Sequence, residues 1–177
     1  INSLFPSINA SVYLGVAPKK ITSYFDSVTF CLSKGLCCPV GSLIVGNKEF
    51  IQECRRWRKI LGSGMRQVGI IAAPGIVALD TMVDRLAEDH LNARFLAEGL
   101  ANIRGILIDP ENIQTNIVRF NLSKEYSNKS KILVSELMKN NIMINPSKNN
   151  FRVVTHNDIS KKDCEYFLLS ISKILGK

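Results

Sequence analysis

The stretch that decides the fold runs from residue 27 to residue 45 and reads SVTFCLSKGLCCPVGSLIV. Residues 27–32 are rich in β-branched and aromatic side chains and are followed by Ser33-Lys34-Gly35, which predicts a short strand and then a turn. The apolar run at residues 40–45 predicts a second strand. Gly35 allows a sharp change of backbone direction, so we expect Lys34 to point into the cleft onto which the strand ends open.

Lys34 has two interpretations at this point. A lysine amine becomes a nucleophile toward carbonyls when desolvation or nearby cations favour its neutral form, and the resulting imine is how proteins hold an aldehyde cofactor. The spacing alone favours the other interpretation, an ordinary solvated lysine in a turn. The surrounding segments are needed to decide between them.

Outward from this stretch, the sequence predicts helices and strands with a division near residue 101. The longest amphipathic pattern, with apolar residues at helical spacing, covers residues 81–101, and Gly105 follows it. We expect one part at residues 1–101 and a small α+β lobe at residues 102–177. The other predicted elements are helices at 8–15, 48–61, 129–140 and 161–175, an apolar segment suited to close helix packing at 68–79, and strands at 106–109, 116–122, 142–145 and 151–155.

The composition is typical of a globular protein, with 46% hydrophobic and 21% charged side chains among 177 residues. No apolar run reaches the roughly 18–20 residues that a membrane span needs, so we expect no membrane partner. The opening residues resemble neither a secretory nor a transit signal. The first residue is Ile rather than Met, which indicates a fragment or a processed product.

The charge balance indicates an anionic partner. Lys and Arg number 23 against 15 Asp and Glu, a formal charge of +8, which suits nucleic acid or a phosphate or carboxylate ligand. Nucleic acid is disfavoured because basic and aromatic residues do not interleave and Trp57 is the single tryptophan. The five cysteines show neither disulfide nor zinc spacing, so we expect no metal and a reduced, cytoplasmic protein.

Taken together, the segments resemble the low-specificity threonine aldolases of the beta-eliminating lyase family, pyridoxal-phosphate enzymes with the aspartate aminotransferase fold (fold type I). The resemblance begins near Asn9 and is carried by motifs in family order: SVTFCLSKGL, PVGS, RRWRK, GSGMRQ, RLAEDH, QTNIV and RVVTH. It implies an α/β fold in which residues 1–101 are the C-terminal part of a large cofactor domain, with the cofactor lysine and interface helices. Residues 102–177 are then the small C-terminal α+β domain.

The resemblance also implies roles for four residues. Lys34 would form the Schiff base with pyridoxal 5′-phosphate. Lys59 and Arg66 match basic residues that approach the cofactor phosphate from a neighbouring subunit, and the glycine-rich loop around Arg66 suits a dianionic phosphate. Arg152 matches the arginine that binds the substrate carboxylate, for which a planar guanidinium is well shaped. The opposing interpretations are a solvated helix face for the RRWRK run and a surface charge for Arg152, and His156 is interpreted as structural.

The implied reaction is that of a carbon–carbon lyase (aldehyde-lyase) that cleaves L-threonine or L-allo-threonine to glycine and acetaldehyde, with the pyridine ring as electron sink. The resemblance further implies a cytoplasmic homo-oligomer, a dimer or tetramer, that acts on a small amino acid in threonine catabolism and glycine biosynthesis. Neither nucleic acid nor a membrane is expected as a partner.

The sequence departs from the family near its start. Ser3-Leu4-Phe5-Pro6 stands where the family has an Asp-Gly-Ala-Arg run, whose Asp keeps the pyridine nitrogen protonated. The family's preceding residues, with the phosphate cup and a stacking histidine, are not among the 177. We therefore expect the isolated chain to be inactive or impaired. The alternative is a non-catalytic relative or fragment that serves as a dimerisation partner.

Cys37 and Cys38 stand beside the lysine where the family usually has small residues. They are interpreted as packing substitutions. The other interpretation is a pair of thiols made reactive by a basic pocket.

Overall fold

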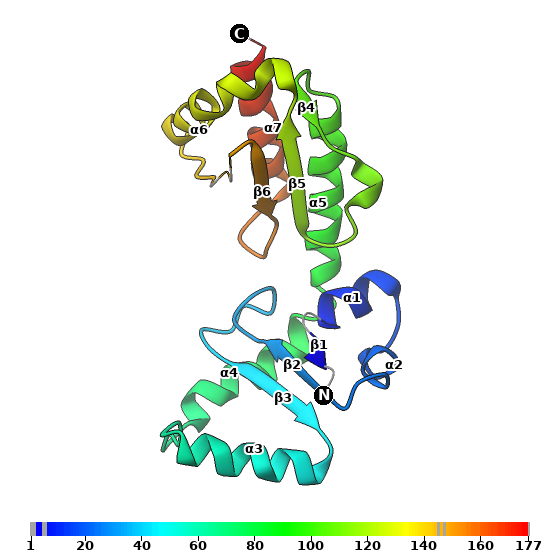
Figure 1. The fold of residues 1–177 in the computed structure, drawn as a ribbon, viewed down its shortest axis with the longest axis vertical. Coiled ribbons are helices and arrows are strands. Elements are labelled where there is room, and N and C mark those ends of the chain that lie inside the picture. The colour runs from blue at the N-terminus through cyan, green and yellow to red at the C-terminus, as the bar shows by residue number, and fades with distance from the viewer. Residues whose placement is uncertain (1–2, 5–6, 145, 147, 177) are drawn as a thin grey trace. The chain divides into compact units, whose positions relative to one another are not determined.

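The structure is a computed structural model that describes residues 3–4, 7–144, 146 and 148–176. By contact, the chain divides into two compact units, residues 1–87 and 88–177, which are described separately (Figure 1). Within the described residues, each unit contains a three-stranded sheet.

The first unit is a small mixed sheet with helices. Strand β2 lies between β1, to which it is parallel, and β3, to which it is antiparallel with Thr29 opposite Ile44. The sheet that contains the lysine strand is therefore mixed in the described part of the chain. The elements are β1 (Ser3–Leu4), α1 (Ser7–Leu14), α2 (Pro18–Thr22), β2 (Ser27–Cys31), β3 (Ser42–Gly46), α3 (Lys48–Ile60) and α4 (Gly69–Thr81).

Helix α3 has well-defined ends that its sequence explains. The side chain of Asn47 caps the first turn by accepting a hydrogen bond from the backbone N–H of Phe50 at 2.8 Å. At the other end, Gly62 takes a φ of +76°, and the N–H of Ser63 reaches back to the carbonyl of Arg58 at 2.9 Å. This is a Schellman ending, which favours glycine at the left-handed position. It fixes where the glycine-rich loop leaves the helix.

The core of the first unit is small, and much of its apolar surface is exposed. Five buried residues form the core: Leu32, Leu36, Cys38, Ala78 and Leu86. By contrast, strand β3 buries none of its residues, and Ile70 of α4 is 84% exposed. Large exposed apolar surfaces in proteins mark places where another part of a protein packs.

The second unit is an antiparallel sheet covered by helices. The strand order is β4-β5-β6, and Phe120 of β5 lies opposite Phe151 of β6, with the two rings stacked 5.0 Å apart. Residues from α5, the sheet, α6 and α7 form one continuous core (Figure 1). The elements are α5 (Leu86–Ala101), β4 (Ile106–Leu107), a 3-10 helix (Pro110–Asn112), β5 (Ile117–Leu122), a second 3-10 helix (Lys124–Lys129), α6 (Ser130–Lys139), β6 (Asn150–Val154) and α7 (Lys161–Leu175).

Most of the predicted helices and strands are confirmed to within a few residues. The helix predicted from Thr81 begins only at Leu86, because the chain turns between α4 and α5 and the N–H of Leu86 bonds to the carbonyl of Val83. Helix α2 is not among the predicted elements. Along the chain, the boundary between the two compact units falls after Ala87, because the core face of α5 packs in the second unit. The domain division after residue 101 stays a prediction.

The strand predicted at residues 142–145 is wrong for residues 142–144, and Asn145 lies outside the described residues. Helix α6 ends with Asn141 at a φ of +59°, and the N–H of Ile142 bonds to the carbonyl of Leu137 at 2.9 Å. The N–H of Ile142, which a strand would use to pair with its neighbour, therefore caps the end of the helix instead. The continuous apolar run at residues 142–144 did not reveal this.

Candidate functional site

Lys34 lies in a closed loop, residues 32–41, which we call the lysine loop. Its ends are joined because the N–H of Leu32 bonds to the carbonyl of Gly41 at 2.9 Å. The carbonyl of Leu32 in turn accepts from the N–H of Cys38 at 3.0 Å, and that of Lys34 accepts from Cys37 at 2.8 Å. These bonds hold the turn around Lys34 without using the lysine side chain.

Two buried leucines anchor the lysine loop on either side of an exposed lysine. Leu32 and Leu36 are 6% and 3% exposed, whereas Ser33 and Lys34 are exposed. A buried leucine on each side fixes the turn between them, so packing of the two leucines keeps Lys34 at the surface of the unit.

Helix α4 packs directly on the lysine loop. The thiol of Cys38 donates a hydrogen bond to the carbonyl of Pro74 at 3.4 Å, and Leu32 approaches the buried Gly75. A Cβ on residue 75 would lie 3.1 Å from Cδ1 of Leu32, so glycine permits this close contact. Cys38 therefore serves packing, as expected, while the thiol of Cys37 is exposed and points to the carbonyl of Gly35 at 3.6 Å.

Lys59 and Arg66 lie on different elements from Lys34. Lys59 is in the last turn of α3, and Arg66 is in the loop at residues 61–68 that joins α3 to α4. Both are exposed. In Figure 1 this loop and the lysine loop lie at separate edges of the first unit. The role of both residues at the cofactor phosphate therefore stays a prediction.

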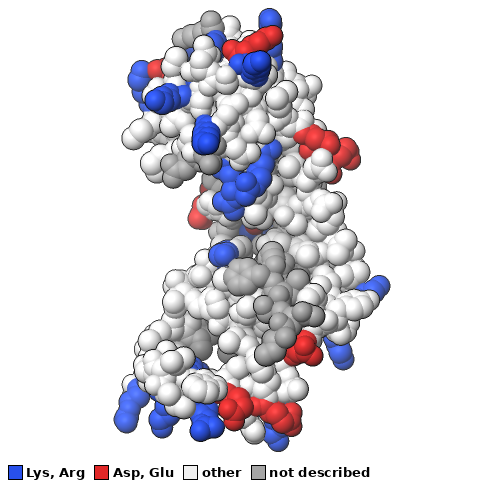
Figure 2. Space-filling view, viewed as in Figure 1, with Lys and Arg blue, Asp and Glu red and all other residues white. Residues whose placement is uncertain are grey.

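Basic side chains gather along α3, which lies at the bottom of the first unit in Figure 1 and where Figure 2 shows a row of blue side chains. The exposed members of this row are Arg55, Arg56, Arg58 and Lys59. Arg56 lies 3.8 Å from Glu53 on the same helix, and both side chains are more than half exposed. An ion pair of this kind contributes little to stability, so the row is a solvated positive surface.

Arg152 lies in the second unit, on the face of strand β6 that points away from the core. Its neighbour Phe151 is fully buried, and Arg152 is exposed beside it, as alternation along a strand requires. Arg152 lines a cavity of about 710 Å³ between β6, the start of α7 and residues 140–144. The cavity has polar and charged groups at its rim, including His156 and Tyr166.

The end of β6 is fixed by a buried threonine. The hydroxyl of Thr155 donates to the carbonyl of Asp89 on α5 at 2.6 Å, and its N–H bonds to the carbonyl of Asn116 at 3.0 Å. Asn92 of α5 donates to the carbonyl of Ile159, just beyond the strand, at 3.2 Å. These contacts hold the backbone that carries Arg152.

His156 has a local structural role, as expected. Its Nδ1 accepts a hydrogen bond from the N–H of Asp158 at 3.3 Å and lies 3.7 Å from a carboxylate oxygen of the same residue. The imidazole therefore closes a tight turn after β6.

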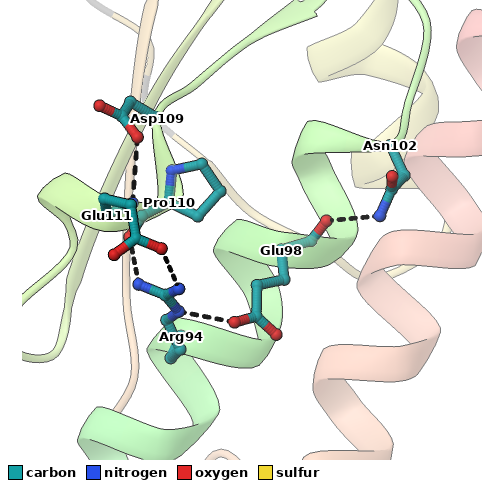
Figure 3. A network of polar contacts seen from close by, with 6 residues as sticks. All are labelled: Arg94, Glu98, Asn102, Asp109, Pro110 and Glu111. Atoms are coloured by element: carbon teal, nitrogen blue, oxygen red, sulfur yellow. Dashed lines mark hydrogen bonds and ion pairs between the residues drawn. The ribbon is translucent and has the colours of Figure 1, made fainter.

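Arg94 joins α5 to the 3-10 helix that precedes β5. Figure 3 shows its guanidinium between the carboxylates of Glu98 and Glu111, with a further bond to the carbonyl of Pro110 at 2.9 Å. The hydrogen bonds to the two carboxylates raise the pKa of Arg94 and lower that of Glu111. The network holds the 3-10 helix in place, and Asn112 of that helix lines a second recess.

A second charged residue, which was not among the predicted site residues, lies on the face that carries Arg152. Arg119 of β5 lies directly opposite Arg152 in the strand register. Arg119 is exposed between the buried residues Val118 and Phe120, and only the pairing of β5 with β6 shows which residue it meets.

Comparison with known proteins identifies the family. The beta-eliminating lyase family matches residues 7–123. The chain belongs to the beta-eliminating lyase family. The match includes the lysine loop, α3, the loop with Arg66 and strand β5, while Arg152 lies beyond it.

Curated relatives extend the match across nearly the whole chain. The chain is 46% identical over 155 residues to the low specificity L-threonine aldolase of Escherichia coli (strain K12), covering 87% of the chain and 44% of that protein. It is 41% identical over 167 residues to the probable low-specificity L-threonine aldolase 2 of Arabidopsis thaliana, covering 94% of the chain and 47% of that protein. The chain thus spans about half the length of these relatives.

Solved structures show the fold. A putative L-allo-threonine aldolase from Listeria monocytogenes matches with a TM-score of 0.78 and 19% identity, covering 98% of the chain and 52% of that protein. An alanine–glyoxylate aminotransferase from Nostoc sp. matches with a TM-score of 0.66 and 16% identity, covering 98% and 53%. The expected α/β fold, an aminotransferase-like fold of type I, is confirmed. None of the described helices is long and apolar enough to cross a membrane.

The donor groups of this beta-eliminating lyase fit an aldehyde cofactor that carries a phosphate. The lysine loop presents one amine on a rigid turn, and exposed cations are available on α3 and in the loop that follows it. In the part of the chain that the structure describes, no three His, Cys, Asp or Glu side chains cluster in a way that could hold a metal ion. Of the four residues in place of the Asp-Gly-Ala-Arg run, Phe5 and Pro6 lie outside the described residues.

Proposed function

We propose that the protein to which these residues belong is a pyridoxal-phosphate-dependent aldehyde-lyase that cleaves L-threonine or L-allo-threonine to glycine and acetaldehyde. The observation that supports this best is Lys34 itself, presented by a closed and anchored loop in a chain of the beta-eliminating lyase family. The names of the curated relatives supply the substrate.

In this proposal Lys34 holds the aldehyde carbon of the cofactor. When bound, pyridoxal phosphate supplies a conjugated ring that accepts the electron pair of the broken carbon–carbon bond. The lysine loop keeps its shape through backbone bonds and buried leucines, so the amine can change its covalent partner while the backbone stays in place.

Arg152 is proposed to bind the α-carboxylate of the substrate. The side chain is exposed on a strand whose end is fixed by Thr155, and a planar guanidinium binds a carboxylate through two parallel hydrogen bonds. Orientation of this kind places the bond to be broken relative to the cofactor.

Lys59 and Arg66 are proposed to act at the cofactor phosphate of a neighbouring subunit, in a cytoplasmic homo-oligomer. The exposed apolar side chains of β3 and α4 support an assembly, because another part of the protein or another copy must cover them. The same observation favours the second candidate, a non-catalytic partner that pairs with an intact subunit. Threonine catabolism and glycine biosynthesis are the pathways proposed.

The test is acetaldehyde formation from L-threonine, followed by coupled reduction of the aldehyde. Because the chain spans about half of its relatives, the assay uses the chain and a chimera in which these residues replace their counterparts in the E. coli relative. Acetaldehyde formation by the chimera that Lys34→Ala abolishes supports the proposal. A folded chimera that binds the cofactor but forms no aldehyde overturns it in favour of the non-catalytic partner.

A further inference from the structure

The outer face of the second sheet presents two arginines as direct neighbours. Along β5, residues 118, 120 and 122 are buried, and residues 117, 119 and 121 are exposed. The antiparallel register places Arg119 opposite Arg152. Directly opposite residues share a face, with Cβ atoms about 4.5–5.5 Å apart, so both arginine side chains leave from one face of the sheet. From there Arg152 lines the cavity of about 710 Å³, and Arg119 lines a separate recess of about 490 Å³.

No carboxylate in the described part of the chain neutralises this pair. Ion pairs described in the second unit join other residues, among them Arg94 with Glu98 and Glu111, Lys139 with Glu136, and His156 with Asp158. Like charges placed directly opposite each other destabilise a strand pair. A bound anion would remove this repulsion.

The side chains that flank the two arginines on the same face carry no charge, and two of them bond to each other. On one side Ile117 lies opposite Val154, and on the other Asn121 lies opposite Asn150, whose amide donates to it at 3.1 Å. Arg119 also lines a recess of about 490 Å³ that contains Asp109.

The carboxylate of Asp109 does not serve the arginines. It accepts hydrogen bonds from the N–H of Glu111 at 3.1 Å and from the side chain of Asn112 at 2.7 Å. It therefore caps the 3-10 helix that Arg94 anchors (Figure 3).

We propose that Arg119 and Arg152 together bind the two carboxylates of a four-carbon substrate, so that the enzyme accepts dicarboxylic β-hydroxy-α-amino acids such as 3-hydroxyaspartate. This inference rests on the proposed function, in which Arg152 takes the α-carboxylate. The second carboxylate of such a substrate lies two carbons from the first, a spacing that two adjacent guanidinium forks can bind together. Threonine, which has one carboxylate, leaves Arg119 without a counter-charge.

The reaction needs no further reactant. The bond between Cα and Cβ of 3-hydroxyaspartate breaks, the hydroxyl proton passes to a base, and the hydroxyl oxygen becomes the aldehyde oxygen of glyoxylate. The electron pair of the broken bond stays with Cα, which takes up one proton and gives glycine. Substrate and products have the same atoms, and nothing is oxidised or reduced overall.

The first test measures the binding of dicarboxylates to the chain, and it needs neither the cofactor nor catalytic turnover. Succinate, with propionate as the monocarboxylate comparison, is titrated into the chain while the side-chain N–H signals of arginine are followed by NMR. We expect succinate to bind more tightly than propionate and Arg119→Gln to weaken succinate binding roughly tenfold or more. Arg119→Lys keeps the charge but loses the planar guanidinium, so its succinate affinity should lie between that of the unmodified chain and that of Arg119→Gln.

The matched control is Arg104→Gln, which removes an exposed arginine from the same unit outside both recesses. It should bind succinate as the unmodified chain does. Equal succinate affinity in the unmodified chain and in Arg119→Gln, with both folded by circular dichroism, overturns the proposal. So does succinate binding no tighter than that of propionate.

The second test uses the chimera with the E. coli relative and compares kcat/KM for 3-hydroxyaspartate with kcat/KM for threonine. We expect Arg119→Gln to lower this ratio about tenfold and Arg104→Gln to leave it unchanged. An unchanged ratio in Arg119→Gln overturns the proposal. Absence of cleavage of both substrates contradicts the proposed function instead, and the binding test still decides whether the two arginines form a dicarboxylate site.

Discussion

Gly35 and Leu86 lie so close together that a side chain on residue 35 would have to displace Leu86. A Cβ on residue 35 would come within 2.8 Å of Cδ2 of Leu86, which is 1% exposed in the core of the first unit. Gly35 directly follows Lys34, so the start of α5 sets the position of the turn that presents the lysine. The glycine serves close packing here, whereas the residues of the loop with positive φ are Cys37, at +58°, and Gly41, at +119°.

We expect Gly35→Ala to destabilise the first unit by about 1–3 kcal/mol, because the added methyl group must displace a buried leucine. The measurement is the midpoint of urea unfolding. Gly64→Ala is the control, since the nearest atom to its new Cβ, Cγ of Lys59, lies 4.0 Å away. Equal midpoints for the two variants would show that Leu86 moves without cost.

Removing the hydroxyl of Thr155 should cost about 1–3 kcal/mol, because Thr155→Val leaves the carbonyl of Asp89 without that donor in a buried place. Thr81→Val is the matched change at an exposed position, where the hydroxyl bonds to the carbonyl of Val77. We expect the control to stay within about 0.5 kcal/mol of the unmodified chain. The prediction fails if both variants unfold at the same denaturant concentration.

Acid should remove the stabilisation that Asp163 gives to α7. Hydrogen bonds from the side chain and backbone of Ser160 lower the pKa of Asp163 in the folded chain, so the unfolded chain takes up the proton more readily. The stabilisation is therefore complete above the usual value of 3.8 and is lost as the pH falls through the lower folded pKa.

The measurement is the melting temperature of Asp163→Asn against the unmodified chain from pH 7 down to pH 2. We expect a lower melting temperature for the variant at neutral pH and convergence in acid. Glu165→Gln, an exposed carboxylate on the same helix, should show a smaller difference at every pH. A difference for Asp163→Asn that persists undiminished in acid would contradict the capping role.

Thiol labelling should separate the cysteines by burial. Cys164 is 1% exposed, and desolvation together with the charges of Asp163 and Glu165 raises its pKa to about 11. Cys37 is exposed in the lysine loop. A brief treatment with iodoacetamide at pH 8, followed by peptide mapping, should label Cys37 and spare Cys164. Alkylation of Cys164 as fast as Cys37 would contradict the packing of α7.

The sequence predicted the lysine loop well because its determinants are local. A β-rich run, a Ser-Lys-Gly turn and a second apolar run are short-range signals, and they correspond to strand β2, the lysine loop and strand β3. The start of α5 was predicted too early because a turn precedes the helix. The strand predicted at residues 142–144 was wrong because the backbone there caps α6. The pairing of Arg119 with Arg152 depends on strand register, which joins residues distant in sequence.

The most direct test of the central claim, that Lys34 holds the cofactor, is covalent capture. The chain is mixed with pyridoxal phosphate, its absorbance is recorded, and borohydride reduction is followed by peptide mapping, with Lys34→Ala as the control. We predict an absorbance band near the visible edge and a single labelled peptide that contains Lys34, both absent in the control. Labelling spread over several lysines, or an unchanged band in Lys34→Ala, would contradict the claim.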